Sequence, residues 1–229
     1  GDAVVGNTGS LAFEVGASQD GLVGDISIAT GTTNGVRGNI QILTGGSTSG
    51  DVVQPGSLDV RTGDSSQSGN ITFATGDSET GESGSIEIKS GASTSGSSGA
   101  IILSGGVSRS TEGGSILIQS GTSQVASGGK IQVVSGSGVV SGSVDISTMV
   151  TTQESGNILL STGLAEISSG STKIISGESK DGKAGDVVLQ AGDGVQAGNV
   201  IVASGSSLQQ GFTGGSVAMS TGSSETAAS

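Results

Sequence analysis

The stretch Gly114-Ser-Ile-Leu-Ile-Gln-Ser-Gly121 shows the unit from which most of this chain is built. It fits the template Gly-x-φ-x-φ-x-[Ser/Thr]-Gly, in which φ is an apolar residue. We number the template from position 0, the opening glycine, to position 7, the closing glycine. Fifteen copies follow one another along the 229 residues, at spacings of 13 to 18 residues, so the chain is a tandem array. The opening glycines are residues 9, 24, 38, 56, 69, 84, 99, 114, 129, 142, 156, 170, 185, 198 and 215.

Apolar and polar residues alternate within each copy. Positions 2 and 4 are Ile, Val, Leu or Phe in nearly every copy, as in Ile71 and Phe73, and positions 1, 3 and 5 are mostly polar. This period of two is typical of a strand with one buried face. Because one strand cannot bury its face alone, the copies are expected to stack. We therefore predict an all-β fold, a single parallel β-solenoid (β-helix) of about 15 coils, with about 14–15 residues and two short strands in each coil.

The segments between copies suggest how such a solenoid would be filled. The residue two places after the closing glycine is small in almost every copy, for example Ser78, Ser93 and Ser123. A small residue at a fixed phase indicates an inward position, so we expect a thin core of Ile/Val ladders facing Ser/Ala ladders. The Ser or Thr at position 6 should also face inward, in a hydroxyl ladder. Glycine at both ends of a copy indicates turns that need positive φ or close backbone approach.

The array is expected to form one continuous domain over residues 1–229. Two wider spacings, of 18 and 17 residues, predict bulged coils near 46–55 and 206–214. Neither end of the sequence carries a polar cap, and an uncapped solenoid exposes sheet edges. We therefore expect a slice of a longer array, or a unit that stacks end to end.

The composition excludes several classes of function. The chain has no His and no Cys, which removes Ser-His-Asp and Cys-His nucleophile systems and the usual zinc sites. Lys plus Arg number 8 against 20 Asp plus Glu, and the net charge of −12 should repel nucleic acid. No apolar run approaches the ~20 residues of a membrane span, so no membrane insertion is expected. These features predict a protein that is not an enzyme and has no cofactor.

Two ligand hypotheses remain open beside that interpretation. Calcium-binding solenoids place Asp in consecutive glycine-rich turns, and a weaker version of this pattern occurs here at Asp64, Asp77 and Asp193. The three turns are not consecutive, so solvated turn carboxylates are the competing interpretation. Ice-binding solenoids carry outward threonine ladders, and four successive copies have threonine at position 6: Thr30, Thr44, Thr62 and Thr75. That position is expected to face inward, and charged residues interrupt the outward positions.

Position 3 changes character along the chain. It is polar in the early copies but often apolar later, where it should face out of the predicted sheet. An exposed aliphatic stripe marks a contact surface, so lateral packing is one interpretation, and residues kept for strand propensity are the other. The candidate contact residues are Ile102, Leu117, Leu159, Val188 and Ile201. Asn70-Ile71-Thr72 is an N-glycosylation sequon whose occupancy the sequence leaves open.

Three copies carry a resemblance to known proteins: Ser68-Gly-Asn-Ile-Thr-Phe-Ala-Thr-Gly76, Gly113-Gly-Ser-Ile-Leu-Ile-Gln-Ser-Gly121 and Ala184-Gly-Asp-Val-Val-Leu-Gln-Ala-Gly192. They resemble the Gly/Ser-rich tandem arrays of large secreted surface proteins of diatoms and other algae, and of bacterial adhesins. The resemblance implies an extracellular or cell-surface location and a role as a structural filament or an adhesin or matrix stalk. Self-association is expected on other grounds, axially from the uncapped ends and laterally from the apolar position 3, and other matrix or surface components are the further partners expected. A binding module for ice, Ca²⁺ or carbohydrate is the alternative.

Overall fold

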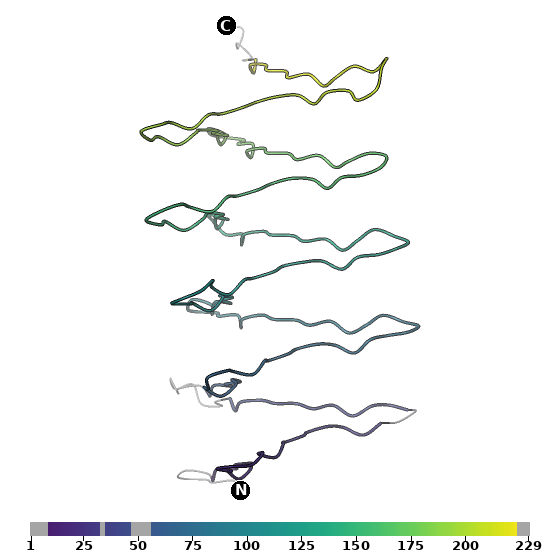
Figure 1. Cartoon of the computed structure of the whole chain (residues 1–229), viewed down its shortest axis with the longest axis vertical. Coiled ribbons are helices and arrows are strands. Elements are labelled where there is room, and N and C mark those ends of the chain that lie inside the picture. Colours follow the sequence, from purple (N-terminus) through teal and green to yellow (C-terminus); the bar gives the residue numbers. More distant parts are fainter. Residues whose placement is uncertain (1–8, 33–34, 47–55, 224–229) are drawn as a thin grey trace. The chain divides into compact units, whose positions relative to one another are not determined.

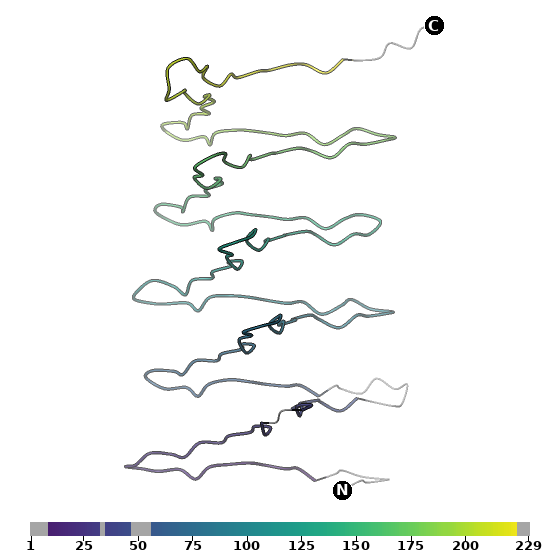
Figure 2. The ribbon, with the colours of Figure 1, turned by 90° about the vertical axis from the view of Figure 1, so that its right-hand side faces the viewer.

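The repeats of this chain are extended segments joined by bends and turns. The computed structural model describes residues 9–32, 35–46 and 56–223, and over these residues it contains no α-helix and no β-strand. Figure 1 accordingly shows neither coiled ribbons nor arrows, and Figure 2 shows the same succession of extended runs and turns from the side. The chain falls into two units, Gly1–Ile116 and Leu117–Ser229.

The predicted all-β solenoid is therefore wrong. In the described residues no two segments pair as strands, and no side chain is buried, so the thin Ile/Val and Ser/Ala core is also missing. The physical reason is that alternation of apolar and polar residues specifies an extended segment but not its partner. Register is weakly specified in glycine-rich segments. Glycine also loses the most backbone entropy on ordering, and it supplies 45 of the 229 residues.

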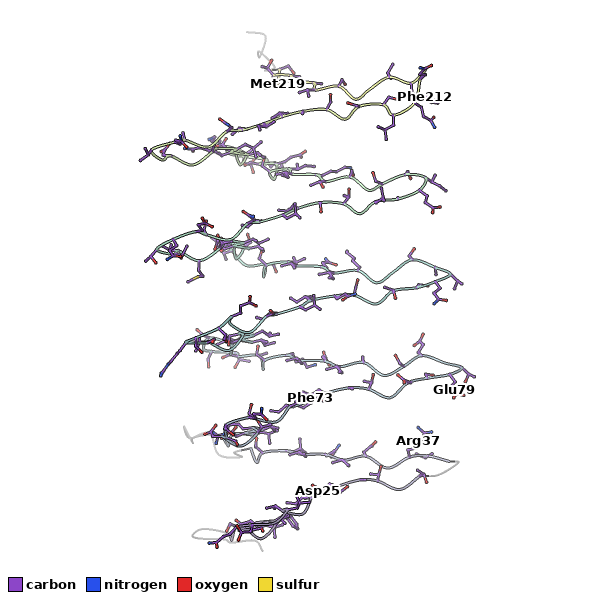
Figure 3. The ribbon with its side chains drawn as sticks, in the orientation of Figure 1. Asp25, Arg37, Phe73, Glu79, Phe212 and Met219 are labelled. Carbon is purple, nitrogen blue, oxygen red and sulfur yellow. The ribbon has the colours of Figure 1, made fainter. Side chains whose placement is uncertain are left out.

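Each extended segment nevertheless has two different faces. Side chains two residues apart interact on one of them: Arg61 with Asp59 at 3.2 Å, Lys89 with Glu87 at 3.1 Å, and Lys130 with Gln132 at 2.9 Å. These residues occupy positions 1, 3 and 5, so those positions share a face of the extended backbone. Figure 3 shows side chains standing out from the ribbon along the segments. Positions 2 and 4 lie on the opposite face.

A backbone hydrogen bond closes the loop between neighbouring copies at five places. In each, the N–H of an opening glycine donates to the C=O of the closing glycine of the copy before it, at 2.8 to 3.1 Å. The loops differ in length, yet the bond joins the same two positions of the template. We call this pair of residues the loop neck. The five necks are Gly106/Gly114, Gly121/Gly129, Gly136/Gly142, Gly192/Gly198 and Gly205/Gly215.

The opening glycine is needed because position 6 of the preceding copy lies against it. A β-carbon placed on Gly84 would be 3.2 Å from Thr75 Cγ2, and one on Gly129 would be 3.2 Å from Ser120 Cβ. Position 6 is also where the chain is best covered, since the half-buried residues of the described part all occupy it. These residues are Thr62, Ser120, Ser135, Ser176 and Ala191.

The closing glycines have a different environment. A β-carbon on Gly121 or Gly136 would meet nothing within 4 Å. Positive φ does not explain them either, because among the described glycines only Gly211 adopts it, at 87°. Gly211 lies in the wide loop predicted as a bulge near 206–214, which the Gly205/Gly215 neck closes at 2.9 Å. The other predicted bulge, near 46–55, falls almost wholly outside the described residues.

The small residue two places after the closing glycine has a role other than the predicted one. It is exposed, and in five copies it is a serine whose hydroxyl accepts a hydrogen bond from the backbone N–H three residues later, at 2.8 to 3.1 Å. This serine turn occurs in five of the six copies that are followed by a 15-residue spacing. The five acceptors are Ser18, Ser78, Ser93, Ser108 and Ser123.

Shorter loops use glycine at the same place. In two of the copies followed by a 13-residue spacing, this residue is Gly138 or Gly194. A β-carbon on Gly138 would lie 3.0 Å from the carbonyl oxygen of Val140, and one on Gly194 equally close to that of Gln196. In these two loops the turn uses the close approach that glycine permits in place of a serine hydroxyl.

We expect Ser93→Ala to release its turn. The Ser93 hydroxyl accepts the Gly96 N–H at 2.9 Å, and an exposed bond of this kind contributes about 0.5–1.5 kcal/mol. The Gly96 amide should then exchange with solvent roughly two- to tenfold faster in ¹⁵N-resolved NMR. Ser93→Thr keeps the acceptor and should keep the slow rate, and Ser97→Ala serves as the control in the same loop. Unchanged Gly96 exchange in Ser93→Ala would show that the hydroxyl does not hold the turn.

Candidate functional site

The candidate site of this chain is a surface, because its described residues form no enclosed centre. One shallow, open depression of about 320 Å³ is lined by the four consecutive residues Arg61, Thr62, Gly63 and Asp64. Arg61 is already paired with Asp59 at 3.2 Å. Such a depression beside one segment offers a single free carboxylate, which is too little to bind a ligand by itself.

The predicted calcium positions are not brought together. Asp64, Asp77 and Asp193 each stand in a separate connecting segment, and in the described part of the chain no three His, Cys, Asp or Glu side chains gather as metal ligands would. Ca²⁺ binds through six to eight oxygen ligands, several of them carboxylates. In the described part of the chain these three residues are therefore separate carboxylates in connecting segments.

The threonines of the ice-binding hypothesis lie against the opening glycines of the copies that follow them. A β-carbon on Gly38 would be 3.3 Å from Thr30 Cγ2, and one on Gly56 would be 3.3 Å from Thr44 Cβ. Thr62 is half-buried, and Thr75 lies beside Gly84 in the same manner. Each of these side chains thus lies close to the opening glycine of the next copy.

The five candidate contact residues at position 3 are all strongly exposed. Ile102, Leu159 and Ile201 are each 84% exposed, Leu117 is 82% and Val188 is 75%. Each lies in a segment of its own, and none is buried against another. Their assignment as a lateral contact stays a prediction.

A larger apolar surface lies on the other face of the same segments. In the copy that opens at Gly114, Ile116 at position 2 is 54% exposed and Ile118 at position 4 is 71% exposed. The same order of exposure, position 2 below position 4 and position 4 below position 3, recurs in the other four copies that have Ile, Leu or Val at position 3. Sequence reasoning identified positions 2 and 4 but assigned them to a core. The structure leaves them on the surface.

This apolar face carries no charge. All 28 charged residues of the chain avoid positions 2, 4 and 6 in every one of the fifteen copies. They lie instead at positions 1, 3 and 5 or in the connecting segments. Lys183, in a connecting segment, pairs with Asp186, at position 1 of the next copy, at 2.8 Å. We name the surface formed by positions 2 and 4 the aliphatic face. When this face is covered by a partner, no charged group loses its hydration.

No family model, no curated protein and no solved structure matches this chain. Among the described residues, no helix has the length and apolar character needed to cross a bilayer.

Proposed function

We propose that this chain is a non-enzymatic structural repeat protein of an extracellular filament, adhesin stalk or matrix, and that it functions as an assembly of many copies. The observation that carries the proposal is the exposure of the apolar residues of the repeat. The chain exposes 23934 Å², whereas a folded monomer of 21.7 kDa exposes about 9,200 Å². The large apolar side chains at positions 2 and 4 are part of this exposed surface, and exposed apolar surface favours association in water.

The remaining features support a mechanical role rather than a chemical one. The three ion pairs found among the described residues are all exposed, and hydroxyl-rich loops separate the segments. Fifteen similar copies offer the same surface many times, so many weak contacts add up along the chain. The likeness of the repeat to secreted surface arrays supports an extracellular location.

Sedimentation velocity of the full chain over a wide range of concentrations tests this proposal, with electron microscopy of the same samples. We expect large assemblies whose share grows with concentration, because each added copy covers apolar surface. A chain that sediments as a monomer at every concentration would contradict the proposal and favour a monomeric binding module.

A further inference from the structure

We propose that the aliphatic face is the contact surface between copies of this chain, and that it packs against the aliphatic face of a second copy. This inference rests on the proposed function and names the surface through which the assembly forms. Its members at position 2 in the copies with an apolar position 3 are Ile101, Ile116, Ile158, Val187 and Val200.

The extent of the face fits a second copy. Stable protein interfaces remove about 1,200–2,000 Å² from water. The large apolar residues at positions 2 and 4 are each 47% exposed or more, so several such pairs are sufficient for a stable dimer and the others permit growth to larger assemblies. Small ligands cover far less area, so they would leave most of the face in water.

The spacing of the apolar pairs along the aliphatic face also favours a second copy of this chain as its partner. Its apolar pairs recur at intervals of 13 to 18 residues, and the intervals are not uniform. A partner of different sequence would need the same irregular series to meet every pair. A second chain has the same series, so its apolar pairs can be matched copy by copy and their contributions combine.

Charge distribution separates this face from the opposite one. Positions 1, 3 and 5 include Asp59, Arg61, Glu87 and Lys89, whose ion pairs lie on that face. Bringing two such faces together would remove paired charges from water, at a desolvation cost that the uncharged face avoids. In these copies the aliphatic face is therefore the side that two chains can bring together most favourably.

Two matched sets of substitutions in the full chain distinguish the faces. The first set changes position 2 to Ser in five copies: Ile101→Ser, Ile116→Ser, Ile158→Ser, Val187→Ser and Val200→Ser. The second set changes the next residue in the same five copies: Ile102→Ser, Leu117→Ser, Leu159→Ser, Val188→Ser and Ile201→Ser. Both sets leave the net charge unchanged, and the second set removes the more exposed side chains, so a larger effect of the first set could not come from exposed area alone.

We expect the first set to raise the concentration needed for half-assembly by at least about 100-fold, and the second by no more than about threefold. The reverse order, or an equal loss in both sets, would overturn the inference while leaving self-association itself intact. A wild-type chain that never assembles would contradict the proposed function as well, so the two failures can be told apart.

A second measurement does not depend on how the substituted chains fold. The chain has no cysteine, so an environment-sensitive dye can be placed on Ile118→Cys, at position 4, or on Gln119→Cys, at position 5. On assembly we expect the emission of the dye at residue 118 to shift to the blue, and that of the dye at residue 119 to stay unchanged. A shift confined to residue 119 would overturn the inference.

Discussion

Gly105→Ala should abolish the protection of the Gly114 amide against hydrogen exchange. The Gly114 N–H donates to the Gly106 C=O at 2.8 Å and forms one of the five loop necks. A β-carbon on Gly105 would overlap the carbonyl oxygen of Gly114 and lie 2.9 Å from its carbonyl carbon. Because both are backbone atoms, the neck must open to admit the methyl group.

The size of the effect follows from two opposing free energies. Overpacking costs about 1–3 kcal/mol, whereas an exposed backbone hydrogen bond contributes about 0.5–1.5 kcal/mol. The free-energy cost of overpacking is larger than the contribution of the hydrogen bond, so the hydrogen bond should be lost. The Gly114 amide should then exchange at the rate of an unstructured chain, up to about tenfold faster than in the wild type.

Gly106→Ala is the matched control for this experiment. A β-carbon on Gly106 would meet nothing within 4 Å, although the residue is the immediate neighbour of Gly105. We expect Gly114 exchange in Gly106→Ala to stay within about twofold of the wild type. If both variants lose protection, glycine flexibility rather than close approach holds the neck. If neither does, the neck is not closed in solution.

The sequence predicted the local features of this chain well. The alternation around Glu87 and Lys89 predicted that both side chains lie on one face, and their 3.1 Å ion pair agrees with this. Glycines such as Gly84 were predicted to need positive φ or a close backbone approach. Gly84 has no positive φ, and the close approach found there is that of the Thr75 side chain. Both features depend on residues close together in the chain, or on the two ends of one loop, and such contacts follow from short-range geometry.

Features that depend on distant residues were predicted poorly. Positions such as Ile116 and Ile118 were assigned to a core because apolar alternation is usually explained by burial, yet both are exposed. Alternation indicates that one face of the segment is apolar, but it does not indicate what covers that face. The serine turn was missed for a different reason, because Ser93 was interpreted only by its small size. Its hydroxyl lies three residues before the Gly96 N–H, and this spacing could have predicted the turn.

Assembly of this chain should strengthen as salt is added. Each chain carries a net charge of −12. Most of this excess negative charge lies in the connecting segments, and none lies on the aliphatic face. Copies brought together by their aliphatic faces therefore carry these like charges close to one another. The Debye length falls from about 30 Å at 0.01 M to about 3 Å at 1 M salt, so the repulsion is screened over that range. We expect the concentration for half-assembly to fall by about tenfold or more.

Neutralising loop carboxylates should reproduce the effect of salt. Six residues that take part in none of the described ion pairs can be changed to their amides, which halves the net charge: Asp77, Glu79, Glu82, Glu112, Glu166 and Asp193. This variant should assemble at low salt as the wild type does at high salt, and its salt dependence should be flatter. Exchanging Asp for Glu and Glu for Asp at the same six positions keeps the charge and should keep the wild-type response. Assembly that weakens as salt is added would mean that attraction between charged groups, and not the uncharged aliphatic face, holds the copies together.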